Sequence, residues 1–228
     1  PQDTPPDPTI FEAVDHLVDA LGAERYIAGT SGGLRAFYLL GGMERGLLEY
    51  ALHPEIVKAA IAYECKRGNL LDKYYIRPGQ DGVLFEEDTA GTNGPLISPS
   101  MYREFCFPAL KERTRNVLSY GKQVLLHACG DNRPLLDMFI EAGIQCYQSL
   151  QTNAGMDLPT LQERWGHALC FWGGVPTELL IDGTPEQVRA AVRDVMLRAG
   201  QRGPFILGPS HSIAKGTKYA NFMAMLDE

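Results

Sequence analysis

Short apolar runs alternate along the chain with longer stretches in which apolar residues recur every three or four positions. A short apolar run is typical of a buried strand, and the wider spacing is typical of an amphipathic helix. Strands that alternate with helices indicate βαβ units and a parallel sheet. The runs predicted as strands are Tyr26–Ala28, Val83–Glu86, Gln123–His127, Gln145–Gln148, Ala168–Trp172 and Pro204–Leu207.

The clearest helix has both a start and a stop signal. Thr184 can cap it, Pro185 takes the first helical position, and the apolar spacing continues to Ala199. The other stretches with the same kind of ending, each followed at once by a glycine, are Ser98–Tyr120, Arg133–Ala142 and Asp157–Trp165.

Two architectures suit such a chain: an open doubly wound sheet and a closed barrel. A glycine-rich phosphate loop after the first strand would favour the open sheet. The segment Gly29–Gly33 fits neither the dinucleotide fingerprint nor the P-loop pattern. We therefore interpret it as a tight strand-to-helix turn.

Polar side chains follow the predicted strands at the points where they end. Both architectures place their functional sites at the carboxyl ends of the strands. The pattern therefore locates a candidate site without deciding whether the sheet closes. The polar residues at these positions are Glu86, Glu87, Asp88, His127, Cys129, Asp131, Gln148, Gln151 and His211.

Length, charge and cysteine usage narrow the class of protein. The 228 residues fit one domain at 10–228, preceded by a Pro- and Asp-rich arm or linker at 1–9. A net charge of −7 argues against a nucleic-acid partner, and no apolar run reaches the roughly 20 residues of a membrane span. Five scattered cysteines argue against a disulfide framework and favour a cytoplasmic location. Those interpreted as buried hydrophobes are Cys65, Cys106, Cys146 and Cys170.

His127 and Cys129 are two positions apart, so on a strand their side chains point to the same face. An imidazole and a thiolate are good zinc ligands, and a catalytic zinc takes about three protein ligands. His211, flanked by small residues, is the candidate for the third. Glu86, Glu87, Asp88 or Asp131 could orient an imidazole. Each residue also has a purely structural alternative. His127 could be hydrogen-bonded by the backbone, Cys129 could be a buried thiol, and His211 could be a helix-capping or loop histidine.

Several motifs in order resemble the uroporphyrinogen decarboxylase superfamily, and the resemblance covers the chain from about Ile10 to Asp227. They are Gly94–Phe105, His127–Gly130, Phe171–Pro176, Gly183–Val188, Gly208–Ile213 and Tyr219–Ala224. The resemblance implies a TIM-type (β/α)8 barrel with its cleft at the carboxyl ends of the strands. The first two βα units of that barrel have no counterpart here, which suggests that the sequence is a fragment of a longer protein.

The superfamily contains two main chemistries, and the chain is similar to both. The His-x-Cys-Gly string is similar to the corrinoid-linked methyltransferases, which implies that His127 and Cys129 bind zinc. That branch usually has a cysteine where His211 stands, and a histidine there is similar to the decarboxylases. The arginine-bearing segment and the essential aspartate of the decarboxylases have no counterpart. Their tyrosine after the third strand falls at Phe37 or Tyr38.

We therefore expect an enzyme that uses Zn²⁺ to transfer a methyl group to a thiol or a corrinoid. Glu86, Asp88 and His211 are the expected catalytic residues, and Gln148, Tyr38 and Asn221 are expected to contact substrate. Expected partners are a small-molecule substrate, a corrinoid protein as methyl donor or acceptor, and a second copy of the chain. The alternatives are uroporphyrinogen III decarboxylation in haem biosynthesis and a non-catalytic, ligand-binding barrel paralogue.

Overall fold

The computed structural model describes residues 1–199 and 202–228, and its architecture is mixed α/β with a six-stranded parallel sheet. The strand order follows the chain order, as in a β/α barrel, whereas the order in a doubly wound sheet reverses at a switch point. The sheet is consistent with part of a TIM-type barrel. Its strands are β1 (Ala28–Gly29), β2 (Gly82–Glu86), β5 (Gln123–His127), β6 (Cys146–Gln148), β7 (Cys170–Val175) and β8 (Phe205–Pro209). The six predicted strands are thus present, with ends shifted by a few residues.

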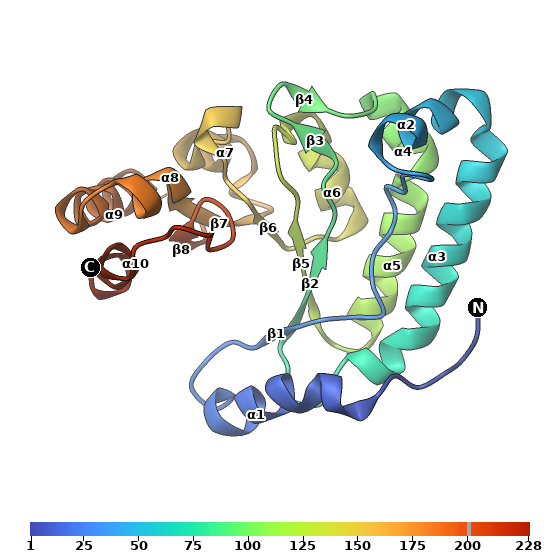
Figure 1. The fold of residues 1–228 in the computed structure, drawn as a ribbon, viewed down its shortest axis with the longest axis horizontal. Coiled ribbons are helices and arrows are strands. Elements are labelled where there is room, and N and C mark those ends of the chain that lie inside the picture. Colours follow the sequence, from blue (N-terminus) through green and yellow to red (C-terminus); the bar gives the residue numbers. More distant parts are fainter. Residues whose placement is uncertain (200–201) are drawn as a thin grey trace. The chain divides into compact units, whose positions relative to one another are not determined.

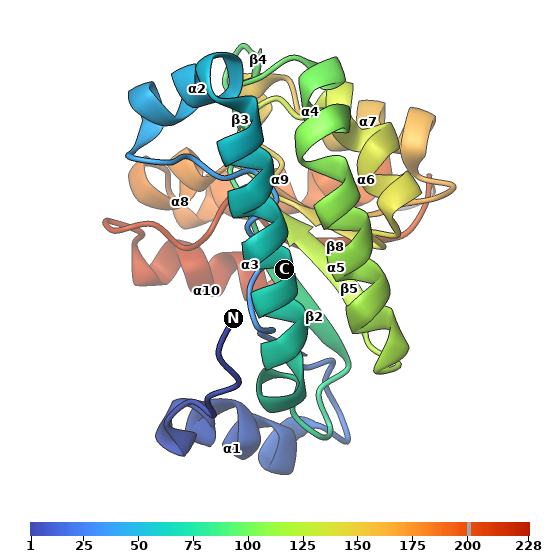
Figure 2. The same ribbon diagram turned by 90° about the vertical axis from the view of Figure 1, so that its right-hand side faces the viewer.

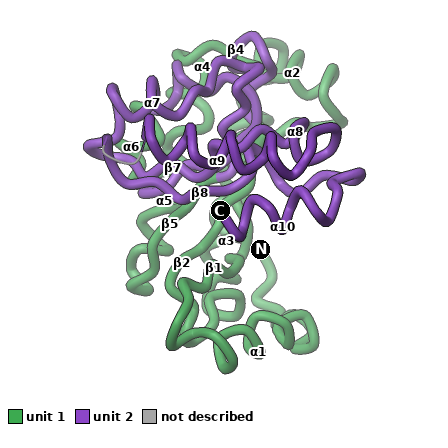
Figure 3. Tube along the Cα trace, turned by 90° about the vertical axis from the view of Figure 1, so that its left-hand side faces the viewer, with its two compact units in different colours: residues 1–88, 96–126, 137–144 green, residues 89–95, 127–136, 145–228 purple. Residues whose placement is uncertain are grey.

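The chain divides into two compact units (Figure 3). Unit 1 consists of residues 1–88, 96–126 and 137–144, and unit 2 of residues 89–95, 127–136 and 145–228. A small antiparallel pair, β3 (Ala90–Gly91) and β4 (Gly94–Pro95), belongs to unit 2. None of the helices in the described residues combines the length and the apolar character needed to cross a membrane.

The long helices α3 and α5 lie side by side in unit 1 (Figures 1 and 2). The arm at the start of the chain contacts α3, because Lys73 and Tyr74 donate hydrogen bonds to the Asp3 carboxylate. The helical elements of this unit are a 3-10 turn at Pro8–Phe11, α1 (Glu12–Leu21), α2 (Met43–Leu52), α3 (Pro54–Tyr75), α4 (Pro99–Phe105), α5 (Phe107–Ser119) and most of α6 (Leu136–Ala142).

The single helix predicted over Ser98–Tyr120 is wrong, because the segment forms two helices, α4 and α5, separated at Cys106. Pro108 is the cause, since proline lacks an N–H and its ring clashes with the carbonyl four residues earlier. It is accommodated in the first turn of α5. The predicted start is confirmed: the Ser98 hydroxyl accepts a hydrogen bond from the Met101 amide at 3.2 Å.

The tight strand-to-helix turn predicted at Gly29–Gly33 is also wrong. Residues 30–42 are non-helical, and the next helix begins at Met43. Side chains from distant segments satisfy the backbone here. The amide of Gly32 donates to the Asp72 carboxylate at 2.8 Å, and that of Tyr38 donates to the Tyr50 hydroxyl at 3.2 Å. The segment therefore needs no helix to pair its amides.

A buried ion pair between Arg113 of α5 and Asp72 of α3 fastens this segment. The guanidinium donates to both carboxylate oxygens, at 2.5 and 2.8 Å, and both side chains are almost fully buried. Arg113 also donates to the Gly33 carbonyl at 2.9 Å, and Asn116 donates to Asp72 at 2.6 Å. Because every lone pair and proton has a partner, the cost of burying both charges is offset.

A second buried carboxylate, Glu87, holds the same segment further along. It accepts hydrogen bonds from the amides of Phe37, at 2.5 Å, and Ala36. Burial raises the pKa of Glu87 to about 8, against the lowering effect of these two amides. The carboxyl is thus a group that titrates near neutral pH in the folded chain.

Unit 2 contains α7 (Leu158–Trp165), α8 (Thr177–Asp182), α9 (Pro185–Ala199) and α10 (Tyr219–Asp227). The predicted start of α9 is confirmed as a reciprocal cap: the Thr184 amide donates to the Gln187 side chain, and the Gln187 amide donates to the Thr184 hydroxyl. One face each of α8, α9 and α10 packs against β7 in a buried cluster. Its members are Val175, Leu180, Val188, Val192, Ala224 and Met225.

Replacing Arg113 with Met should lower the free energy of unfolding by about 3–5 kcal/mol, because Asp72 would be left buried and unpaired. The matched control is Arg193→Met, whose exposed partner Glu228 lies at 2.8 Å and whose loss should cost at most about 1 kcal/mol. Urea unfolding followed by circular dichroism measures both. A cost for Arg113→Met as small as that of the control would contradict the role given to the pair.

The raised pKa of Glu87 gives stability a definite dependence on pH. Between about pH 4.5 and pH 8 the folded state keeps the proton while the unfolded chain has lost it, so the free energy of unfolding falls as pH rises. Glu87→Gln keeps an acceptor for Phe37 and should remove up to about 4 kcal/mol of this decline. Urea unfolding across that pH range tests it, with the exposed neighbour in Glu86→Gln as control. Equal slopes for Glu87→Gln and the unaltered protein would refute the assignment.

Candidate metal centre

The carboxyl ends of parallel strands position the candidate ligands. His127 is the last residue of β5, Cys129 follows it by two residues, and His211 follows the end of β8 by two. All three belong to unit 2. The site is thus assembled from segments that are far apart in the chain.

The sulfur of Cys129 lies between the two imidazoles. Its Sγ is 3.2 Å from Nε2 of His127 and 2.8 Å from Nε2 of His211. The two rings are nearly perpendicular, with centroids 5.2 Å apart. One ligand atom from each residue lies within 4.8 Å of the others. The structure therefore brings together the three residues that the sequence singled out.

Gln148, the last residue of β6, determines how the His127 ring is used. Its Oε1 contacts Nδ1 of His127 through a short hydrogen bond between two buried side chains. An amide oxygen only accepts, so Nδ1 carries the proton and Nε2 presents a lone pair towards Cys129. This is the arrangement in which metal-binding histidines are usually held. The sequence indicated Gln148 as a substrate contact and did not reveal this orienting role.

The His211 ring is held by its own backbone. The Ser212 amide donates to Nδ1 at 2.7 Å, which leaves the ring proton on Nε2, directed at the Cys129 sulfur. Before Nε2 can bind a metal, this proton has to move to Nδ1, which requires the hydrogen bond from the Ser212 amide to break. Because the Cys129 thiol also has to become a thiolate, uptake of a metal is expected to be coupled to proton release.

The turn after His127 is too tight for a side chain at Gly130. Its φ is +81°, and a Cβ there would lie 2.5 Å from the carbonyl oxygen of Ala90. Asn132 holds the turn by donating to the Cys129 carbonyl at 2.7 Å, and the Gly130 amide donates to Gln151 at 2.7 Å. These contacts position the sulfur, and the His-x-Cys-Gly string is the only sign of them in the sequence.

Ser149 is a residue that sequence reasoning missed. Its φ of +96° makes it the only non-glycine residue with positive φ in the described part of the chain. The hydroxyl donates to the Ser210 carbonyl at 3.2 Å and lies 4.0 Å from the Cys129 sulfur. In a regular strand, successive side chains point to opposite faces. The unusual φ lets Gln148 and Ser149 both reach the site.

The three donors fit a zinc ion. Two imidazole nitrogens and one sulfur form a donor set typical of catalytic zinc, which usually has three protein ligands. Zinc–ligand bonds of about 2.0–2.3 Å place tetrahedral ligands roughly 3.3–3.8 Å apart. The separations here, from 2.8 Å to at most 4.8 Å, bracket that range, so small side-chain adjustments suffice.

The acids expected nearby have other surroundings. Asp131 pairs with Arg133 through bonds of 2.8 and 2.7 Å, which hold the pKa of its carboxyl below the usual range. Glu86 and Asp88 are exposed side chains of unit 1. For His127, the orienting role expected of an acid is taken by Gln148.

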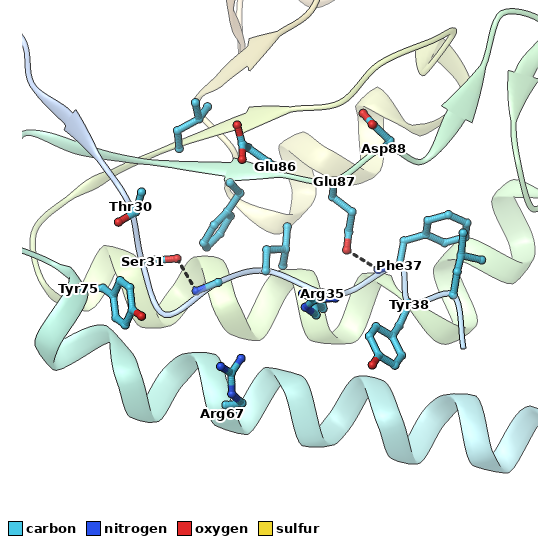
Figure 4. A pocket seen from close by; sticks show the side chains of 15 residues that line it. Thr30, Ser31, Arg35, Phe37, Tyr38, Arg67, Tyr75, Glu86, Glu87 and Asp88 are labelled. Carbon is cyan, nitrogen blue, oxygen red and sulfur yellow. Dashed lines mark hydrogen bonds between the residues drawn. The ribbon is translucent and has the colours of Figure 1, made fainter. Parts of the chain in front are cut away.

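Glu86, Asp88 and Tyr38 line a cavity of about 680 Å³ within unit 1 (Figure 4). Arg35 belongs to the same lining, and Arg67 lines it from α3. Glu87 also lines the cavity, and its carboxylate accepts a hydrogen bond from the Phe37 amide. The cavity therefore combines two guanidinium groups with exposed carboxylates.

Asn221 lies elsewhere in unit 2, fully buried at the start of α10. Its amide nitrogen donates to the carbonyls of Leu180, at 3.1 Å, and Gly183, at 3.0 Å. It thereby pairs carbonyls left over at the end of α8. The sequence indicated Asn221 as a substrate contact and did not reveal this structural role.

Comparisons with known proteins are consistent with this geometry. The family model described as uroporphyrinogen decarboxylase (URO-D) matches residues 2–228. A search of curated proteins finds no match. Among solved structures, a methyltransferase from Methanosarcina mazei is similar, with a TM-score of 0.78 and 20% identity over 96% of this chain. The match covers 63% of that protein, and at this identity it shows a shared fold.

The family match extends over nearly the whole chain. The chain belongs to the uroporphyrinogen decarboxylase family.

Proposed function

We propose that the protein is a zinc-dependent methyltransferase that acts on a thiol or a corrinoid. The observation that carries the proposal is the convergence of Cys129 Sγ with one nitrogen each of His127 and His211 within 4.8 Å. A bound zinc would lower the pKa of an incoming thiol, so that it reacts as the thiolate. The fold shared with a protein named as a methyltransferase supports the proposal.

The residues of the chain prepare the centre for this chemistry. Gln148 keeps the proton of His127 on Nδ1 and leaves Nε2 available. Asn132 fixes the carbonyl of Cys129, and Ser149 places a hydroxyl 4.0 Å from its sulfur. One thiolate and two neutral imidazoles give the ligand set a net charge of −1. A metal there keeps more Lewis acidity than one held by two thiolates.

Glu86 and Asp88, the two acids that the sequence indicated as catalytic, are proposed to accept or donate a proton during the reaction. Glu86 and Asp88 are exposed and line the cavity of unit 1, where a substrate group could contact them. Tyr38 lines the same cavity and is proposed as a substrate contact. A corrinoid protein is the proposed partner for the methyl group.

A second candidate, porphyrinogen decarboxylation, is favoured by one observation. Arg35 and Arg67 line the unit 1 cavity, and a substrate with several carboxylates requires such cationic groups. A histidine rather than a cysteine at 211 is also similar to the decarboxylases. Against it, the same cavity carries the exposed carboxylates of Glu86 and Asp88.

The purified protein should contain about one zinc ion per chain, and Cys129→Ala should lower the content to near zero because a catalytic zinc depends on all of its roughly three ligands. The matched control is Cys65→Ala, which removes a buried sulfur that bonds the Ala109 carbonyl in unit 1 and should leave the zinc content unchanged. Plasma mass spectrometry measures both. Zinc-free protein, or full zinc in Cys129→Ala, would rule out the centre.

Zinc-loaded protein supplied with methylcobalamin and a small alkanethiol should produce the methyl thioether, detected by mass spectrometry. Cys129→Ala should be slower by at least about a hundredfold, because the thiol is no longer activated. Incubation with uroporphyrinogen is run in parallel. Loss of carboxyl groups there, undiminished in Cys129→Ala, would favour the decarboxylase. Tight binding of a substrate without any product would favour a non-catalytic barrel.

A further inference from the structure

Two cysteines lie directly opposite each other at the amino ends of two neighbouring strands, β6 and β7. Cys146 is the first residue of β6 and Cys170 the first residue of β7, and the register pairs them with each other. Paired residues of neighbouring strands point to the same face of a sheet. Neighbouring strands lie about 4.8 Å apart, within the Cα separation of roughly 4.4–6.8 Å that a disulfide spans. The spacing of the two strands therefore suits a bond between the two sulfurs.

The two thiols already interact. Both cysteines are unbridged; Cys146 is buried, whereas Cys170 is partly exposed. A hydrogen bond from the Cys146 thiol to the Cys170 sulfur raises the pKa of Cys146 and lowers that of Cys170. The thiolate is the nucleophile in sulfur exchange, so Cys170 is the better attacking group. It is also the more accessible of the two.

The two cysteines of unit 1, Cys65 and Cys106, have the surroundings of unreactive thiols. Cys65 bonds the Ala109 carbonyl, and burial raises its pKa to about 11. Cys106 is fully buried beside the Tyr50 hydroxyl, and burial raises its pKa strongly. Within the described residues, neither of these two thiols is hydrogen-bonded to a second sulfur. Cys146 and Cys170 differ from these two cysteines because they lie opposite each other and because the pKa of one of them, Cys170, is lowered.

We propose that Cys146 and Cys170 form a redox-active dithiol that is converted to an intramolecular disulfide by exchange with a small disulfide of the glutathione type. The Cys170 thiolate attacks one sulfur of the small disulfide, whose S–S bond breaks and releases the first small thiol. Cys146 then loses its proton and attacks the Cys170 sulfur of the mixed disulfide, releasing the second. The protein loses two protons and two electrons in all, and the small disulfide gains them to become two small thiols.

This site is separate from the candidate metal centre. Cys146 starts β6 and Gln148 ends it, on the same face of the strand. The dithiol therefore lies at the amino ends of β6 and β7, while the His127–Cys129–His211 centre lies at the carboxyl ends. Oxidation of Cys146 and Cys170 requires no zinc, and the disulfide can be detected without measuring any enzymatic activity.

The test treats the full-length protein with oxidised glutathione, alkylates the remaining thiols, digests the chain and maps it by mass spectrometry. The expected product is a peptide pair joined through Cys146 and Cys170, lighter by two hydrogens and restored by dithiothreitol. Cys65 should remain fully alkylated. Complete alkylation of Cys146 and Cys170 after treatment, or a bridge from either to Cys129, would overturn the proposal.

Two variants test the order of attack. In Cys146→Ser, Cys170 should accumulate as a stable mixed disulfide with glutathione, because no second thiol resolves it. In Cys170→Ser, Cys146 should stay unmodified, because its thiol is buried and its better-placed partner is missing. Glutathione on Cys146 in the second variant, with none on Cys170 in the first, would refute the assigned roles. The mapping of the unaltered protein decides the proposal if either variant fails to fold.

Discussion

The common direction of the strands is the constraint on which the rest of the molecule depends. Because parallel strands run the same way, their last residues gather at one edge and their first residues at the other. Cys129 and His211 are separated by 82 positions in the chain, yet their side chains are in contact. The same constraint places Cys146 beside Cys170 at the opposite edge. One topological rule thus creates two sulfur-containing sites with different surroundings.

The two units hold their irregular segments by different chemistry. In unit 1, buried carboxylates bind the backbone of residues 30–42, and their charge makes that segment sensitive to Arg113 and to pH. In unit 2, neutral groups do the equivalent work around Cys129: Asn132 donates to its carbonyl, and Tyr147 donates to that of Ala128 at 2.6 Å. Neutral supports add no charge that would compete with the sulfur for a cation.

The sequence predicted the features that depend on local pattern or on strand ends. The six strands, the start of α9 and the meeting of His127, Cys129 and His211 follow from apolar runs, caps and parallel topology. The break between α4 and α5 was missed, although Pro108 stands in the sequence, because the apolar spacing continues across it. The form of residues 30–42 and the orienting role of Gln148 were missed for another reason. They rest on contacts between residues 12 to 50 positions apart, which no local pattern encodes.

The left-handed backbone of Ser149 limits what can replace it. With φ at +96°, β-branched and bulky residues are excluded, and glycine, asparagine and aspartate are the tolerated substitutes. Two of these carry a side-chain oxygen one bond further from the main chain than the serine hydroxyl, which lies 4.0 Å from the Cys129 sulfur. The substitutions that the backbone tolerates at Ser149 would therefore change the number or the position of side-chain oxygen atoms near the candidate metal centre. The main-chain conformation of residue 149 thus restricts which side chains evolution can place beside the candidate metal centre.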